Sequence, residues 1–450
     1  MEANEKKNRI RTFLISIVRG KPQSKKNILL NEDKELQKRI FIILVACHIG
    51  AFVQSCAYFI QNTAFPYLTK ELHVSPQVYG YVISLTAILQ LIGGPLCGRL
   101  GDIYGGRLTL IISFLALAIS YSLLSISTNI PMLFISRIST IAAHALQSTY
   151  MIISDVTFEE ERANMIGKIG VSHGLGMIVG SGIGGFITDK FGIRPAIVVA
   201  IFVVLICAVV AFIMIPRDTK AIRTILDETR SKTTLDCSLK SMHSVSEQKQ
   251  GTSSFGLKEI IAVAKTKHMI YLLAIKTISG FPFSVLGAMF TLILMDYYML
   301  GPKDNGIVLS YLGVVGMITQ GYLVGVLTHY VNDADLILIA IMLMAAGSLF
   351  LIISQSIVLF CVVAIPLTIG GSLLHIIITS LITKIVPKDK TGSALGLTMC
   401  THAIIRTFSP TIGGFLFQHI GFYSFGLLGY VINLSLVVYL IFYGRIDFEA

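Results

Sequence analysis

Apolar stretches long enough to cross a membrane recur along the whole sequence. Each has about twenty residues, and a helix of that length crosses a hydrocarbon core roughly 30 Å thick. The composition agrees, because 54% of the 450 residues are hydrophobic and 14% are charged, whereas a soluble domain is nearer one-quarter charged. The sequence therefore predicts an all-α polytopic membrane protein with twelve transmembrane helices. Their expected ranges are 40–61, 77–100, 107–127, 131–154, 165–187, 195–215, 268–298, 306–328, 335–354, 358–385, 391–418 and 423–443.

One connection between the apolar stretches differs from the others. Residues 217–257 are rich in Ser, Thr and Lys and too polar to pack, which predicts a flexible cytoplasmic linker. This linker divides the chain into two groups of six helices. The expected domains are a basic cytoplasmic tail (1–39), an N-terminal six-helix bundle (40–215), the linker (216–267), a C-terminal six-helix bundle (268–443) and a cytoplasmic tail (444–450).

Lysines and arginines are distributed unevenly over the predicted connections. If both termini are cytoplasmic, twenty-nine of the 36 lie on the cytoplasmic side, four lie outside and three lie within helices. Because cytoplasmic loops carry an excess of Lys and Arg, this asymmetry predicts that both termini are cytoplasmic. It also accounts for the net charge of +11 without any nucleic-acid partner. Whether the membrane is the plasma membrane or an endomembrane stays open.

The two halves repeat part of their sequence. GSGIGGFITDKFG (180–192) matches SPTIGGFLFQHIG (409–421) without a gap at an offset of 229. The same offset pairs His173 with His402. A weaker match sets GGPLCGRLGD (93–102) beside QGYLVGVLTH (320–329). Two matches at nearly one offset predict two pseudo-symmetric six-helix bundles.

The loop between the second and third predicted helices combines glycines with charges. In this loop, CGRLGDIYGGRLTL, the residues Gly98, Leu100, Asp102, Gly105 and Arg107 fill the places of the signature loop of the major facilitator superfamily, which it resembles. The resemblance implies the major facilitator fold, with a substrate site midway across the membrane between the two halves. Gly98 lets two helices approach closely, and Gly105 permits a sharp reversal of the chain.

The charged residues of this loop predict a gate on the cytoplasmic side. Asp102 is expected to face the helix N-terminus at Thr391–Ser393, where partial positive charge favours a carboxylate. Arg107 is expected to pair with Asp155 at the end of the fourth helix. These contacts would hold the inward side closed and would break when it opens.

The fifth predicted helix carries GMIVGSGIGG, which resembles the antiporter signature of the superfamily. Ser181 stands where that signature has a proline. Glycines at this spacing also let helices pack closely, whatever is transported, and we place this packing role ahead of an antiport-specific one. The expected packing residues, including those of the repeat, are Gly176, Gly180, Gly184, Gly185, Pro410, Gly413 and Gly414.

Four further stretches resemble the organic-cation-transporter-like branch of the solute carriers. They are YGYVISLTAILQLIGGPLCGRLGD (79–102), MDYY (295–298), LSYLGVVGMITQG (309–321) and IIRTFSPTIGGFLF (404–417). The likeness extends over most of the predicted helical core. It implies a carrier of small organic solutes that exchanges organic cations for protons.

Three basic residues lie well inside predicted helices. A charge there costs several kcal/mol unless it faces a wet cavity or a partner, so Arg137, Lys276 and Arg406 are candidate substrate or proton-coupling residues. Arg137 also occupies the place of an arginine in the superfamily's fourth-helix signature, which relatives use in proton coupling. The alternative for each is a structural pin that caps backbone carbonyls of a neighbouring helix.

Histidines add candidate proton carriers, because imidazole changes charge near neutral pH. His144 is seven residues, or two helical turns, from Arg137 and is expected on nearly the same face. His173 and His402 are related by the repeat and could face each other, and His48 lies in the first helix. The alternative for each is a hydrogen-bonded packing residue.

The charges conflict with the resemblance. No Asp or Glu lies deep in any predicted helix, whereas three cations do, so Coulomb repulsion favours an anionic, zwitterionic or neutral amphiphile. Aromatic faces such as Tyr58, Phe281 or Phe283 offer a cation another means of binding. We rank organic cations first on the resemblance, and anions or neutral amphiphiles as the alternative.

A membrane scaffold or tether with a transporter fold is a further alternative. No nucleophile–base set or metal-ligand spacing is present, so neither enzyme activity nor a cofactor or metal is expected. The expected partners are a small organic solute, protons and the lipid bilayer. The protein is expected to be a monomer.

Overall fold

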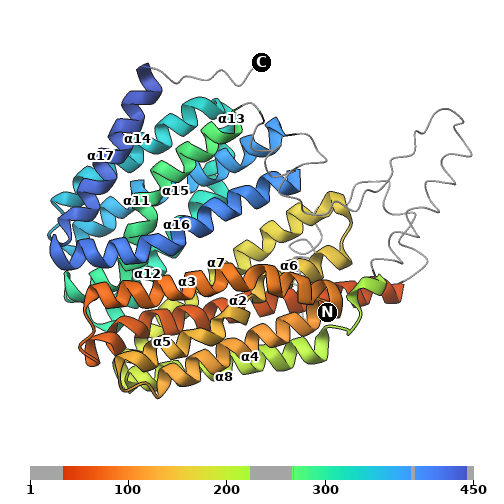
Figure 1. Cartoon of the computed structure of the whole chain (residues 1–450). Helices are drawn as coiled ribbons and strands as arrows, with labels where there is room; N and C mark the ends of the chain where they lie inside the picture. Colours follow the sequence, from red (N-terminus) through yellow and green to blue (C-terminus); the bar gives the residue numbers. More distant parts are fainter. Residues whose placement is uncertain (1–33, 223–265, 267, 387–390, 443–450) are drawn as a thin grey trace, which may run out of the picture.

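The computed structural model describes residues 34–222, 266, 268–386 and 391–442 (Figure 1). Most of the predicted N-terminal tail, the predicted linker and the C-terminal tail lie outside these residues. The described chain is helical and contains no strand. An all-α membrane protein was predicted, and this fold is confirmed.

The first half contains six membrane-crossing segments, of which the fourth is interrupted. They are α2 (Lys34–Glu71), α3 (Pro76–Tyr104), α4 (Gly106–Ser125), the interrupted α5 (Ile130–Ile138), η1 (Ser139–Ala142) and α6 (Ala145–Val156), then α7 (Glu159–Phe191) and α8 (Ile193–Met214). The continuous helix expected at 131–154 is therefore wrong, because η1 is a 3₁₀ turn and Ala143 and His144 are not helical.

The second half also contains six segments among the described residues. They are α11 (Met269–Asp296), α12 (Pro302–Ile318) continued by the π-helical η2 (Thr319–Leu323) and α13 (Val324–Tyr330), then α14 (Asp333–Ile352), α15 (Ile357–Ile385), α16 (Thr391–His419) and α17 (Tyr423–Phe442). Ten segments of the described chain are long and apolar enough to cross a membrane. The other two expected segments are the interrupted fourth and the more polar α16.

Local sequence signals set the helix ends. Ser75 precedes Pro76 and accepts a hydrogen bond from the Val78 amide at 3.4 Å, and Asn129 accepts one from Met132 at 3.1 Å. Such caps satisfy backbone amides that the first turn of a helix leaves free. The turn between α3 and α4 requires Gly105, whose φ is +87°, a value that other residues rarely adopt.

Within the N-terminal half, α7 packs closely against α2 through its glycines. A Cβ atom added at Gly180 would lie 2.5 Å from the carbonyl oxygen of Cys56, and one at Gly184 would lie 2.6 Å from the Cα of Ile60. Gly176 lies in the same way against Phe52 and Ser55. These three glycines therefore allow contact between the two helix backbones.

We expect Gly180→Ala to lower the free energy of unfolding by about 1–3 kcal/mol, because the added methyl group overlaps the backbone of α2. Thermal unfolding of the purified protein in detergent measures the change. Gly174→Ala on the same helix is the matched control, because no atom lies within 4 Å of its added Cβ. Equal melting temperatures for the two variants would contradict this packing.

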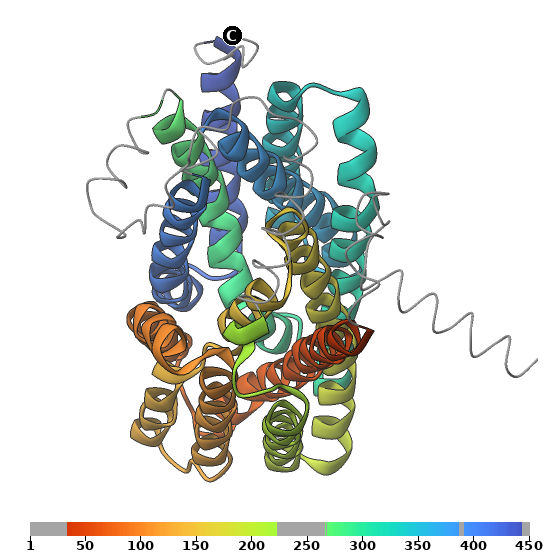
Figure 2. The same ribbon diagram turned by 90° about the vertical axis from the view of Figure 1, so that its right-hand side faces the viewer.

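The two halves are separate bundles that meet chiefly along two helix pairs, α3 with α16 and α7 with α12 (Figures 1 and 2). Smaller contacts join α2 and α3 to α11, and α2 to α12. We call the side of the molecule where Lys34, Ile222 and Met269 lie the linker side, and the opposite side the loop side. In Figure 1, α3 and α16 lie side by side on the loop side and separate toward the linker side.

Small residues and hydrogen bonds join the halves on the loop side. A Cβ at Gly80 would overlap the carbonyl oxygen of Pro410, and one at Gly414 would lie 2.5 Å from that of Pro76. Thr411 Oγ1 donates to Ser84 Oγ at 2.8 Å. The α7–α12 contact has the same character and is made by Ser181, Gly185, Gly306 and Ser310, with the two serine hydroxyls 2.9 Å apart.

Candidate functional site

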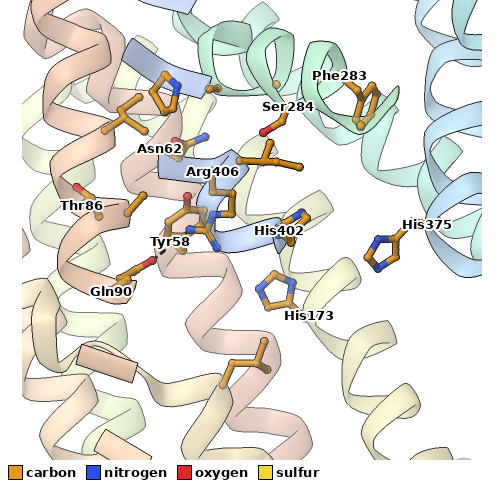
Figure 3. Close-up of a pocket in the computed structure, with 18 of the residues that line it drawn as sticks. Tyr58, Asn62, Thr86, Gln90, His173, Phe283, Ser284, His375, His402 and Arg406 are labelled. Atoms are coloured by element: carbon orange, nitrogen blue, oxygen red, sulfur yellow. Dashed lines mark hydrogen bonds between the residues drawn. The ribbon is translucent and has the colours of Figure 1, made fainter. Parts of the chain in front are cut away.

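A cavity of about 930 Å³ lies between the two halves. Side chains from α2, α3, α5, α6 and α7 line it on one side, and side chains from α11, η2, α14, α15 and α16 line it on the other. Figure 3 shows part of this wall, with labelled residues of α2, α3, α7, α11, α15 and α16. Its volume is within the range of pockets that hold small organic molecules. This cavity is the candidate binding site.

The cavity wall is rich in basic groups. Arg137, Lys276 and Arg406 all line it. No Asp or Glu is among the described residues of its wall. Four histidines add to the wall, namely His144, His173, His375 and His402. Any charged solute therefore enters a cavity whose fixed charges are positive.

Arg137 is almost completely buried, with 6% of its surface exposed. Its guanidinium carbon lies over the ring of Phe65, 4.5 Å from the ring centroid. Tyr121, Tyr58 and Tyr79 also lie near it. Its Nε is buried without a hydrogen-bond partner among the described residues. A ring face balances only part of such a charge.

Lys276 and Arg406 both have neutral partners. Lys276 is 7% exposed, and its Nζ donates to Thr379 Oγ1 at 2.9 Å. Arg406 Nη2 donates to Gln90 Oε1 at 3.1 Å, a contact from α16 to α3 across the cavity (Figure 3). Neither partner neutralises a charge, so both cations can attract an anion.

The predicted histidines have different surroundings. His173 and His402 both line the cavity, but the ring that faces His402 is His375, with centroids 6.1 Å apart. His173 instead lies edge-on to Phe59, with centroids 6.4 Å apart. His48 lies between α2 and α7, where its Nδ1 is 2.8 Å from Ser172 Oγ, and it is not among the residues that line the cavity.

His144 lines the cavity, but a break in the helix places it there rather than regular helical spacing from Arg137. The two-turn spacing from Arg137 assumed a continuous helix and is wrong, because the chain leaves the helix between them. The carbonyl oxygen of Ile141 in the break lies against Gly93 of α3. The His144 amide donates to Ser113 Oγ of α4 at 3.2 Å. Contacts with α3 and α4 therefore stabilise the non-helical backbone of the break.

The gate residues do not make the predicted contacts in this conformation. Arg107 Nη2 donates to the carbonyl oxygen of Phe212 at 2.5 Å, and its guanidinium lies over the Phe212 ring. Asp155 is buried and accepts from Thr219 Oγ1 at 2.6 Å. The Arg107–Asp155 pair is absent in this conformation, because each side chain has another partner, and it stays a prediction for the conformation in which the linker side is closed.

The other gate positions lie on the linker side. The Asp102 side chain is exposed, and the backbone carbonyl oxygen of Asp102 accepts a hydrogen bond from Lys220 Nζ. The expected partner of Asp102 is the helix N-terminus at Thr391–Ser393, where α16 begins and whose side chains lie outside the described residues. A Cβ atom at Gly98 would lie 3.3 Å from Gln147 Nε2. Gly98 therefore lies close to the fourth segment, as its role in helix approach requires.

The repeat-related packing residues join α16 to two other helices. A Cβ at Gly413 would lie 2.6 Å from Met289 Cγ on α11, whereas Gly414 and Pro410 lie against α3. Gly185 of α7, which the repeat pairs with Gly414, lies against α12 of the other half. These positions therefore include contacts between the halves, whereas Gly176, Gly180 and Gly184 contact only α2 among their nearest neighbours.

Several residues in the cavity wall were not predicted as site residues. His375 lies within a predicted helix, and the amides Asn62, Gln90 and Gln147 interrupt apolar runs. Polar side chains in a membrane helix need a partner or a wet cavity. An amide side chain within an apolar run is visible in the sequence, so these three amides could have been predicted as site residues.

Comparison with known proteins agrees with the architecture. The model of the family described as Major Facilitator Superfamily matches residues 47–332 and 272–449. Solute carrier family 22 member 18 of Rattus norvegicus is 30% identical over 403 residues, which is 88% of this chain and 93% of the relative. Multidrug resistance protein 1 of Bacillus subtilis is 27% identical over 78% of this chain and 84% of its own.

Two solved structures have a similar fold at low sequence identity. The nucleoside transporter NupG superposes with a TM-score of 0.68 and 13% identity, and the match covers 90% of this chain and 100% of that one. The peptide transporter POT superposes with a TM-score of 0.67 and 13% identity, covering 90% of this chain and 95% of that one. Both are evidence for the fold alone.

Proposed function

The chain belongs to the Major Facilitator Superfamily, and we propose that it is a monomeric secondary transporter that moves small organic solutes by alternating access. The observation that carries this proposal is the position of the cavity between two bundles that touch on the loop side. Rocking of one bundle against the other would close the linker side and open the loop side around a bound solute.

The distribution of Lys and Arg indicates which side of the membrane the open side of the cavity would face. The excess of Lys and Arg supports a cytoplasmic linker side, so the conformation would be inward-open. The gate at Asp102 would form only when the linker side closes, which accounts for its exposure here. Either the plasma membrane or an endomembrane is compatible with this orientation.

We propose protons as the exchanged ion. The cavity wall offers no described carboxylate to carry a proton, but it offers histidines, of which His375 and His402 lie side by side. Imidazole binds and releases protons near neutral pH. Exchange would then depend on the pH gradient across the membrane.

Two charge classes of solute are candidates. The relatives support organic cations or drug-like amphiphiles, and Tyr58 and Phe283 line the cavity with aromatic faces that could hold a cation. The basic wall supports organic anions or neutral amphiphiles. A scaffold or tether that keeps the fold is the candidate without transport.

Uptake into sealed proteoliposomes tests the proposal. Two tritiated solutes with the same ring system serve as probes, 2-naphthalenesulfonate as the anion and 2-naphthyltrimethylammonium as the cation. We expect saturable uptake of at least one, stimulated by a pH gradient. Uptake of neither probe above that of empty liposomes would favour a scaffold or tether.

A further inference from the structure

We propose that the break in the fourth membrane segment is an anion-binding site, so that the transported solute carries a sulfonate, phosphate or carboxylate group. Arg137 is the group that would pair with the anion, and His144 and the N-terminus of α6 line the same cavity and add to its positive potential. The proposal rests on the proposed function for its role in transport, but binding at the site can be measured without transport.

The first observation is the unbalanced charge of Arg137. Its side chain lines the cavity and is 6% exposed, and its Nε has no hydrogen-bond partner among the described residues. An arginine that served as a structural pin would donate to backbone carbonyls of a neighbouring helix, but the Arg137 guanidinium lies on the face of Phe65. A buried cation requires a counter-charge or full hydrogen bonding. The edges of the guanidinium can provide that pairing to an anion bidentately.

The second observation is the helix terminus that follows Arg137 along the chain and lines the same cavity. Because the chain leaves the helix at Ser139–His144, a new helix of twelve residues begins inside the membrane at Ala145. No side chain caps this N-terminus, and Ala145, Leu146 and Gln147 line the cavity. The free amides and the helix dipole make such a terminus attractive to anions. Interrupted membrane helices direct their N-termini at anionic substrate groups in the same way.

The third observation is the imidazole of His144, the residue just before α6. Its Nε2 is buried without a hydrogen-bond partner among the described residues, and its side chain lines the cavity. The ring also hydrogen-bonds the backbone carbonyl of Ile141, so the protonated imidazole has a second N–H, at Nε2, that can donate to an anion. Two buried, unpartnered nitrogens therefore flank one break, together with an uncapped helix start.

The opposite wall adds positive charge. Lys276 and Arg406 reach the cavity from α11 and α16, and their recorded partners, Thr379 and Gln90, are neutral. The titratable groups nearest this pair are His375 and His402. A cationic solute would meet repulsion from both walls, whereas an anion held at the break would be attracted by both.

The experiment measures binding of the two naphthyl probes to the purified, full-length protein in detergent. We expect wild type to bind 2-naphthalenesulfonate saturably and at least about tenfold more tightly than 2-naphthyltrimethylammonium. Arg137→Met should weaken sulfonate binding at least about thirtyfold, and Arg137→Lys should weaken it less. Naphthyl phosphate and naphthyl carboxylate serve as further probes that rank the three anionic groups.

Two controls separate binding from folding. Lys303→Gln removes an exposed lysine outside the cavity wall and should leave sulfonate binding unchanged. In the absence of probe, Arg137→Met should melt at the same temperature as wild type or higher, because an apolar side chain replaces an unbalanced buried charge. A pin would show the reverse, with a lower melting temperature and unchanged binding.

The outcomes distinguish this proposal from the proposed function. Preference for the cation, binding of none of the anions, or full sulfonate affinity in Arg137→Met would each overturn the anion site. Saturable uptake of only the cation would retain the transporter and reject the site. Sulfonate binding that depends on Arg137 without uptake of either probe would retain the site and reject transport.

Discussion

We expect Gly80→Leu to move the protein out of the conformation described above. Gly80 of α3 lies against the backbone of Pro410 on α16, and a Cβ there would overlap a carbonyl oxygen. A backbone atom cannot move aside as a flexible side chain can, so the two helices must separate on the loop side. The strain of about 1–3 kcal/mol would shift the equilibrium between the two states roughly 5–150-fold.

Distances between spin labels measure this shift. One pair, at Tyr104 and Tyr330, marks the linker-side ends of α3 and α13, where both side chains are exposed. A second pair, at Phe191 and Met299, marks the loop side. In Gly80→Leu, the linker-side distance should shorten and the loop-side distance should lengthen.

Two variants make this result specific. Gly414→Leu enlarges the other face of the same contact, where a Cβ would lie 2.5 Å from the Pro76 carbonyl oxygen, and it should give the same shift. Gly170→Leu on α7 has no atom within 4 Å of the added Cβ and should give none. Unchanged distances in both contact variants would show that the contact between α3 and α16 does not open.

Lys276→Gln should change solute affinity in a direction that depends on the charge of the solute. Lys276 is 7% exposed and donates to Thr379, and glutamine keeps a donor at this position without the charge. An anion loses an attractive partner, so sulfonate binding should weaken by about 2–5 kcal/mol. A cation loses a repulsion, so its binding should improve or stay the same.

Equilibrium binding of the two naphthyl probes measures this effect, with Lys303→Gln as the control that removes the same charge outside the cavity. A role in proton coupling gives a distinct result, in which exchange persists but no longer depends on the pH gradient. Unchanged binding of the sulfonate in Lys276→Gln would contradict the attraction between Lys276 and an anion, and a change confined to the cation would favour organic cations as the solute.

Hydropathy was sufficient to predict the twelve segments, because lipid demands long apolar helices and short connections. It could not predict the break in the fourth segment. Between Met132 and Ser154 the sequence has neither Gly nor Pro, and the break depends on contacts with α3 and α4 that are distant in sequence. A feature that tertiary packing creates leaves little local signal.

The candidate site was predictable only in part, because only some of its features leave a local signal in the sequence. Charged residues inside apolar runs are conspicuous, and Arg137, Lys276 and Arg406 were therefore found from the sequence and do line the cavity. The Arg107–Asp155 pair stays a prediction, because gate contacts depend on conformation and this conformation gives both side chains other partners. The spacing of His144 from Arg137 failed because it assumed regular helix geometry.

Cross-linking the loop side tests alternating access most directly. In a chain without its seven native cysteines, Ser84→Cys with Thr411→Cys places two thiols where hydroxyls now lie 2.8 Å apart between the halves. Ser279→Cys with Asn433→Cys is the control, because that pair, 2.5 Å apart, joins α11 to α17 within one half.

We predict that oxidation of the 84–411 pair reduces probe uptake into proteoliposomes to that of empty liposomes, because the loop side can no longer open. A reductant should restore uptake, and oxidation of the 279–433 pair should leave it unchanged. Undiminished uptake through protein fully cross-linked between positions 84 and 411 would contradict alternating access between these two halves.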